Sequence, residues 1–324
     1  MSYMEDCKAV AIAQNSPEWL EWRNAGIGGS EIAAIVGASK WATALSVWAK
    51  KTGIDKSQVE ENGNMEWGHR LEAAITDKWL DEHKDYALEI RGPVFERIDK
   101  PWMRASLDNI VTNPDGEFEA LECKTAGSDA DWYDPVGAEC VPEAYMWQAF
   151  WQMAVTGIRK VHFSVLVMGR ERTWLDRTLE WDDKYIDYAI AKGGQFWELV
   201  ESATPPSLSE ENPEADANAL KAIFPKVEEN LAVELGNDGE AELDTLVALV
   251  AQLDATEKQI EAKKNWFKAR MGNTQYCSAN GRKVCTASSS IRESIDSKAL
   301  KAAHPEIAKQ FAKSTPVKTY RFAV

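Results

Sequence analysis

Residues 102–126, WMRASLDNIVTNPDGEFEALECKTA, decide the fold. The runs at 102–111 and 117–124 are rich in the apolar and β-branched residues that predict strands. Asn113-Pro-Asp-Gly between them is a turn signal, so we expect the two strands to pair as an antiparallel hairpin. A β-sheet built around this hairpin is therefore the predicted centre of the fold.

The chain on either side of the hairpin alternates between helical and strand-like patterns. Ser16 followed by Pro17 begins the first helix, Ser30 caps the second and Gly37 ends it. The predicted helices lie near 16–25, 31–36, 42–52, 65–83, 142–157 and 182–202, and the remaining predicted strands at 86–98 and 160–168. This order predicts an α/β fold in which a central mixed sheet is flanked by helices.

Residues 203–218, ATPPSLSEENPEADAN, are polar and rich in proline, so they predict the end of the first domain. We expect a core at 1–204, an acidic linker at 205–238 and a basic C-terminal extension at 239–324. The extension is predicted to form a long helix at 239–271, two short strands around Gly281, a helix near 296–313 and a final strand at 317–324.

The net charge of −15 opposes nucleic-acid binding, because phosphates attract cations. The charge is unevenly distributed, however. Residues 255–324 hold 14 Lys and Arg against 5 Asp and Glu, whereas residues 201–254 hold 2 against 13. A protein that encloses DNA in one basic channel can be acidic elsewhere, so the charge by itself selects no function.

The composition predicts a cytoplasmic protein with a sizeable core, since 44 % of its residues are hydrophobic. The chain lacks a run of about eighteen apolar residues, which excludes a transmembrane helix. Its start, MSYMEDCKAV, lacks the features of a signal peptide. Five scattered cysteines without a CxxC pair are typical of a reducing compartment and argue against a zinc or iron–sulfur site.

The hairpin also carries the residues most suited to chemistry. Side chains at i and i+2 of a strand share a face, so Glu122 and Lys124 project together while Cys123 points to the other side. Asp108 lies near the end of the neighbouring strand, so two carboxylates and an ammonium group are expected to converge. Two carboxylates suit a hard cation such as Mg²⁺, with Mn²⁺ as a substitute, which takes water and phosphate oxygens as its other ligands. An exposed strand face with an ion pair is the alternative interpretation.

The frame around these residues resembles the PD-(D/E)XK nuclease superfamily, and within it the phage-type YqaJ recombinase exonucleases, a lambda-exonuclease-like family. Five short segments carry the resemblance over about residues 15–170. They are Trp19-Leu-Glu-Trp-Arg23 with Gly26-Ile-Gly-Gly-Ser30-Glu31, Trp67-Gly-His-Arg-Leu-Glu72, Met103-Arg-Ala-Ser106-Leu-Asp108, Leu121-Glu-Cys-Lys124 and Tyr145-Met-Trp-Gln148. Leu107 stands where the family name suggests proline, but it contributes no ligand. The resemblance implies a restriction-endonuclease-like core, with a C-terminal α+β extension beyond it.

The resemblance implies a metal site on the hairpin and on the helix before it. Asp108 and Glu122 match the metal-binding carboxylates, and Glu72 matches a helical glutamate that reaches the same ion. The backbone carbonyl of Cys123 matches a further ligand. Lys124 matches the catalytic lysine that assists the attacking water.

The resemblance also implies how a DNA end is held. Arg23, Ser30 and Ser106 match a pocket for a 5′-phosphate, and arginine suits this role because it donates two hydrogen bonds to one phosphate. Gln148 matches the glutamine that positions the attacking water or lysine, and Met65 matches an apolar wedge between terminal base pairs.

Structural interpretations of the same side chains remain open. Arg23 could instead stack on a tryptophan of its own helix. Gln148 could be a buried polar residue, and Met65 could belong to the core. Most of the tryptophans are expected in the core, but Trp41 or Trp48 could stack on bases.

The implied activity is that of a Mg²⁺-dependent 5′→3′ exonuclease, phage or prophage encoded, that acts on double-stranded DNA ends. It would release 5′-mononucleotides and leave 3′ single-stranded overhangs. The implied partners are two further copies in a ring-shaped homotrimer and a single-strand annealing protein. The alternatives are a structure-specific or restriction-like endonuclease of the same superfamily, and a non-catalytic scaffold that binds DNA ends.

Overall fold

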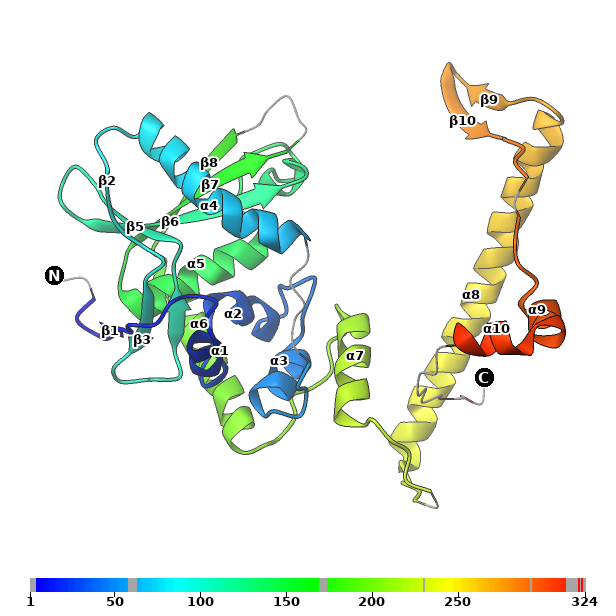
Figure 1. Cartoon of the computed structure of the whole chain (residues 1–324), viewed down its shortest axis with the longest axis horizontal. Helices are drawn as coiled ribbons and strands as arrows, with labels where there is room; N and C mark the ends of the chain where they lie inside the picture. The colour runs from blue at the N-terminus through cyan, green and yellow to red at the C-terminus, as the bar shows by residue number, and fades with distance from the viewer. Residues whose placement is uncertain are drawn as a thin grey trace. The chain divides into compact units, whose positions relative to one another are not determined.

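The computed structural model describes residues 4–57, 63–168, 174–229, 231–291, 293–312, 320 and 322. The chain forms two compact units, Met1–Pro225 and Lys226–Val324 (Figure 1). None of the helices in these described ranges is long and apolar enough to cross a membrane. Most of the final strand predicted at 317–324 lies outside the described residues.

The first unit is organised around a five-stranded mixed sheet with the order β2-β5-β6-β7-β8. These strands span Ala87–Arg91, Asn109–Thr112, Phe118–Ala126, Lys160–Val167 and Trp174–Glu180. Strands β6 and β7 run parallel, and the other neighbours run antiparallel. A smaller antiparallel sheet contains β1 (Cys7–Ala9), β3 (Val94–Arg97) and β4 (Arg104–Ser106). Strands β1 and β8 were not predicted.

The predicted hairpin forms, but its first strand is divided between the two sheets. Strand β5 pairs with β6 in the register that places Asn109 opposite Leu121. The predicted strands at 86–98 and 102–111 each break in two, because the chain crosses from one sheet to the other. Gly92 makes the first crossing with a φ of +63°, a left-handed conformation that favours glycine. Its N–H donates to the carbonyl of Asp108, 2.8 Å away, which fixes the start of β5.

The six predicted helices of this unit are present among the described residues, flank the sheets and follow the predicted order. They are α1 (Pro17–Asn24), α2 (Gly29–Ile35), α3 (Ala44–Lys51), α4 (Gly63–Glu82), α5 (Glu143–Thr156) and α6 (Asp183–Glu201). Ser16 caps α1 as predicted, since its hydroxyl accepts from the N–H of Trp19. The prediction that Ser30 caps α2 is wrong. Gly28 is the N-cap, and Glu31 satisfies its N–H, so Ser30 lies inside the first turn.

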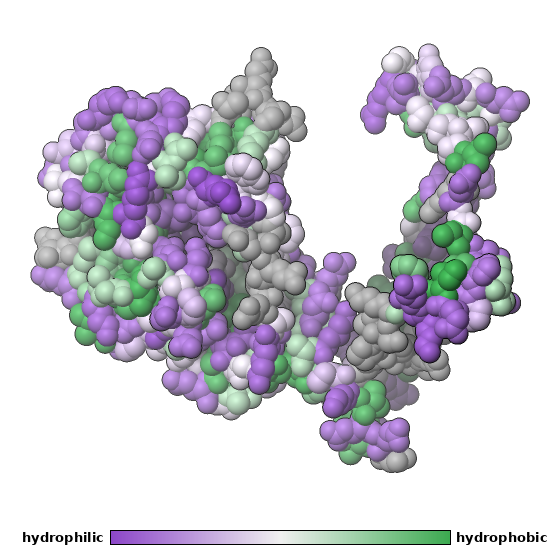
Figure 2. Space-filling view, viewed as in Figure 1, coloured by the Kyte–Doolittle hydropathy of each residue, from purple (hydrophilic) through white to green (hydrophobic). Residues whose placement is uncertain are grey.

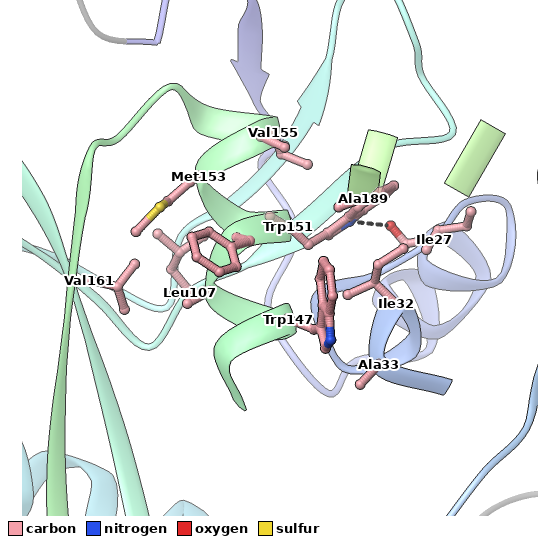
Figure 3. Close-up of a cluster of buried hydrophobic side chains, with 14 of the residues drawn as sticks. Ile27, Ile32, Ala33, Leu107, Trp147, Trp151, Met153, Val155, Val161 and Ala189 are labelled. Atoms are coloured by element: carbon pink, nitrogen blue, oxygen red, sulfur yellow. Dashed lines mark hydrogen bonds between the residues drawn. The ribbon is translucent and has the colours of Figure 1, made fainter. Parts of the chain in front are cut away.

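Helix α5 passes through the middle of the core and joins the two sheets. Trp151 on this helix is fully buried, and its indole N–H lies 3.0 Å from the carbonyl of Ile27 (Figure 3). The same N–H lies 3.0 Å from the carbonyl of Arg104. Ile27 precedes α2 and Arg104 begins β4. One buried donor therefore fixes both backbone segments against α5, and an unsatisfied carbonyl there would be costly.

The close packing of α6 on Trp151 gives a stability prediction. A Cβ at Gly193 would lie 2.6 Å from the Trp151 ring, whereas the nearest atom to a Cβ at Gly194 is a Trp102 ring carbon at 3.8 Å. We expect Gly193→Ala to lower the free energy of unfolding by about 1–3 kcal/mol, because overpacked cores strain. Gly194→Ala is the matched control and should raise it by up to about 1 kcal/mol through helix propensity. Equal urea midpoints for the two variants would contradict this packing.

The first unit extends beyond the predicted core boundary at residue 204. Within the predicted acidic linker, α7 (Pro213–Ile223) begins at an Asn212 cap and packs on α3. Asp216 is buried there and accepts a hydrogen bond from the Thr43 hydroxyl at 2.5 Å. The units therefore divide at Pro225 rather than at 204, because the polar segment hides a short amphipathic helix.

The second unit consists of a long helix, a hairpin and two short helices. These are α8 (Gly236–Met271), β9 (Tyr276–Ala279), β10 (Arg282–Thr286), α9 (Ser297–Ala303) and α10 (Pro305–Gln310). The predicted long helix and the hairpin around Gly281 are confirmed. The helix predicted near 296–313 is two helices, because Pro305 interrupts it.

Candidate metal and phosphate site

The two carboxylates and the lysine of the hairpin meet where β5 begins. A carboxylate oxygen of Asp108 accepts from the backbone N–H of Cys123 at 2.8 Å. The Lys124 ammonium lies 2.8 Å from the carboxylate of Glu122. The Cys123 thiol lies on the opposite face, 3.3 Å from the hydroxyl of Thr76. The structure therefore brings Asp108, Glu122 and Lys124 together as predicted, and it places the Cys123 side chain on the opposite face of the strand as predicted.

Two glutamines of α5 hold the buried Glu122 from the other side. The Gln148 side-chain N–H donates to one carboxylate oxygen at 2.9 Å, and that of Gln152 donates to the other at 2.8 Å. Glu122 is only 1 % exposed, so these donors supply hydrogen bonds that its buried carboxylate oxygens could not obtain from water. Gln152 was not among the predicted site residues. The signal was present, since residues four apart on a helix share a face.

Burial and mutual repulsion shape the electrostatics of this cluster. Burial, together with the charge of Glu122, raises the pKa of Asp108 to about 8. Burial lowers the pKa of Lys124, but Glu122 and Asp108 outweigh it and hold that pKa above its ordinary value. Lys124 therefore stays protonated. The carboxylates of Asp108 and Glu122 repel one another, and a divalent cation between them would reduce this repulsion.

The donor set fits a hard cation only in part. Asp108 and Glu122 supply oxygen ligands, and the backbone of Cys123 lies beside Asp108. Glu72 on α4 is half-buried and close enough to raise the pKa of Asp108. Within the described ranges, however, no three His, Cys, Asp or Glu side chains are grouped closely enough to hold an ion. Glu72 would have to move nearer to become a third carboxylate ligand.

The three residues matched to a phosphate pocket line one small cavity of about 80 Å³. The Arg23 guanidinium donates to the Ser30 hydroxyl at 2.8 Å, and the Trp19 indole N–H donates to the Ser106 hydroxyl at 3.0 Å. Arg23 also lies over the Trp19 ring, 5.2 Å from its centroid. Stacking and lining the cavity are therefore compatible roles for this arginine.

Arg104 is a second guanidinium of this cavity, and the sequence analysis gave it no role. It stacks over Trp22 at 4.9 Å and lies 3.7 Å from the carboxylate of Glu96. Its Nη1 is buried without a hydrogen-bond partner among the described residues. An unsatisfied buried donor beside Arg23 is what an anion in the cavity would complete.

A larger groove of about 630 Å³ adjoins the cavity and shares Ser30 and Gln148 with it. Trp41 lines this groove and is 88 % exposed. Trp48 is buried and donates its indole N–H to the carbonyl of Leu199, so stacking of Trp48 on bases is excluded. Met65, the predicted wedge, is exposed on the first turn of α4.

The site and the sheet together give a mixed α/β protein in which Asp108, Glu122 and Lys124 form a D…ExK constellation. Residues 18–159 match the model of the YqaJ-like viral recombinase domain. The chain is 26 % identical over 321 residues to the uncharacterized protein YqaJ of Bacillus subtilis (strain 168), covering 96 % of this chain and 97 % of that one.

Solved structures of exonucleases are also similar. An alkaline exonuclease from Laribacter hongkongensis is 20 % identical with a TM-score of 0.47, over 58 % of this chain and 94 % of that one. A phage-related exonuclease from Haemophilus somnus 129PT is 14 % identical with a TM-score of 0.42, over 55 % of this chain and 94 % of that one.

Proposed function

We propose that the protein is a Mg²⁺-dependent exonuclease that digests duplex DNA from the 5′ end, releases 5′-mononucleotides and leaves a 3′ overhang. The observation that carries the proposal is the shared side chain of Gln148. It lines the phosphate cavity and also donates to Glu122. A terminal phosphate in the cavity would therefore lie next to the two carboxylates that would act on the bond beyond it.

Each residue of the site has a part in this reaction. Asp108, Glu122 and the Cys123 carbonyl would hold the ion, and Glu72 would complete the ligand set only if it came nearer to them. When bound, Mg²⁺ would supply Lewis acidity toward the phosphate and a lower pKa for water. The Lys124 ammonium orients the attacking water and stabilises the negative charge that develops on the phosphate. Gln148 and Gln152 keep the Glu122 carboxylate in place.

The decisive assay uses linear duplex labelled at either end, with Mg²⁺ or with EDTA. We expect mononucleotides from the 5′-terminated strand with Mg²⁺, less activity with Mn²⁺, and none with EDTA. Covalently closed circular duplex should resist digestion. Nicking of the circle would favour a structure-specific or restriction-like endonuclease. Binding of duplex ends without any cleavage would favour a scaffold.

The phosphate cavity gives a prediction about DNA ends. We expect Arg23→Ala to lower the rate on 5′-phosphorylated duplex roughly 10- to 100-fold, the range of a lost charge-assisted hydrogen bond, and to leave 5′-hydroxyl duplex little affected. The readout is the ratio of the two initial rates. Arg70→Ala, on the exposed face of α4, is the control and should keep the wild-type ratio. Equal losses on both ends would contradict the cavity's role.

We further propose that three copies enclose the DNA and that a single-strand annealing protein receives the 3′ overhang. Trp41, beside the groove, and Met65 are the exposed apolar side chains best placed to touch separated bases. A ring would reconcile the acidic overall charge with DNA binding, because basic side chains could face its channel while acidic ones face outward.

A further inference from the structure

Helix α8 carries an apolar seam with alternating spacings of three and four residues. This spacing averages 3.5 residues and is typical of helices that form coiled coils. The seam consists of Leu243, Leu246, Val250, Leu253, Ile260, Phe267 and Met271. Glu257 and Lys264 occupy its two polar positions. The helix has 36 residues and is therefore about 54 Å long, which is enough for five heptads.

Much of this seam lies at the surface of the second unit. Leu253, Ile260 and Phe267 are 57 %, 47 % and 36 % exposed. Figure 2 shows apolar residues at the surface of this unit among hydrophilic ones. A helix with an apolar stripe needs a partner surface to bury it.

The charges of α8 are segregated along its length. Residues 236–254 contain Asp238, Glu240, Glu242, Asp244 and Asp254 and no basic residue. Residues 255–271 contain five Lys and Arg against two Glu. The acidic part of the helix is therefore complementary to the basic part of an identical helix that runs the opposite way.

We propose that α8 pairs with α8 of a second copy of this chain as an antiparallel coiled coil. The spacing of the seam allows a register in which residue 255 of one helix lies opposite residue 255 of the other. In it, Leu243 lies opposite Phe267 of the second copy, and Val250 lies opposite Ile260. A twofold axis makes this contact self-complementary and closed.

The charged residues that flank the seam favour the antiparallel orientation over the parallel one. In the antiparallel register, Glu240 faces Lys268 of the second copy and Glu242 faces Arg270, and the twofold axis repeats both pairs. A parallel pair would instead place Lys263 beside Lys268 and form no opposite-charge pair at the flanking positions.

The antiparallel pairing has three electrostatic costs. Glu257 and Lys264 lie on the seam opposite Leu253 and Leu246 of the second copy, where partial burial of a charge is unfavourable. Asp254 meets its own copy near the axis, which is one repulsive contact. Within one chain, Lys268 bonds Glu261 at 2.8 Å, an exposed pair that costs little to rearrange.

The first test measures the mass of the full-length protein by sedimentation equilibrium. Leu253→Asp with Ile260→Asp should halve the number of chains per particle, from six to three if the first unit forms the proposed ring of three and from two to one if it stays single. Gln252→Asp with Gln259→Asp adds the same charge on the outer face of α8 and should leave the mass unchanged. Circular dichroism checks that both variants keep their helix. An unchanged mass in the seam variant, or a threefold fall, would overturn the proposal.

The second test determines the orientation of the two helices by reversing the charges that flank the seam and measuring the mass again. Lys268→Glu with Arg270→Glu should weaken association, as should Glu240→Lys with Glu242→Lys. The variant with all four substitutions should regain the wild-type mass, because the pairs re-form with their signs exchanged. In a parallel pair, Lys268→Glu would instead remove a repulsion and strengthen association, and that result would refute the antiparallel arrangement.

Discussion

Lys124→Ala is expected to slow Mg²⁺-dependent digestion of linear duplex by roughly 10²- to 10⁴-fold, the usual contribution of a positioned proton-transfer or charge-stabilising group. The ammonium is held 2.8 Å from Glu122, and its raised pKa keeps it charged. Among the described residues, no other Lys or Arg forms an ion pair with Glu122 or Asp108, so the loss of this ammonium should not be compensated.

Metal binding separates the proposed role of Lys124 from a structural one. The alanine variant should bind Mg²⁺ at least as tightly as the wild type in a calorimetric titration, because a positive charge next to the ion is gone. Lys160→Ala, at the start of β7, is the matched control and should digest DNA normally. A Lys124→Ala protein that is folded, binds metal and retains the wild-type rate would disprove the site assignment.

Glu122→Gln should abolish measurable digestion and also weaken Mg²⁺ binding. The substitution keeps the shape of the side chain but removes one of the two charges offered to the ion. If the ion contributes several kcal/mol to the reaction, the rate falls by about 10³-fold or more. The stabilisation of the fold by Mg²⁺ should disappear with it, since a ligand stabilises only the protein that binds it.

A control on the same strand isolates the effect of position. Glu119→Gln changes a carboxylate of β6 that pairs with His162 at 2.5 Å and lies three residues before Glu122. We expect this variant to lose some stability but to keep its Mg²⁺ response and its cleavage of DNA. If Glu119→Gln and Glu122→Gln lost activity equally, a general disturbance of the sheet would explain both.

The hairpin and its convergent side chains could be predicted because local rules determine them. The turn at Asn113 fixes which strands pair, and alternation along β6 fixes that Glu122 and Lys124 share a face. Ser30 illustrates what such rules miss. Whether it or Gly28 caps α2 depends on the Glu31 side chain, which reaches back to the Gly28 N–H.

Features that depend on long-range packing could not be read from the sequence. Gln152 and Arg104 join the site only because α5 lies against β4 and β6. The helix at 213–223 looked like linker because its polar residues dominate, and the burial of Asp216 depends on packing against α3, where Thr43, 173 residues away, donates to it.

Gln148 sets the distance between the phosphate cavity and the Glu122 carboxylate. One side chain spans the interval between the cavity that would seat a terminal phosphate and the carboxylate that would act on the next bond. The length of each released fragment would then be set by the width of a single amide on a rigid helix. Such a site would release one nucleotide per cleavage. A variant that releases longer fragments would need a different α5, because changing a surface loop would not alter this distance.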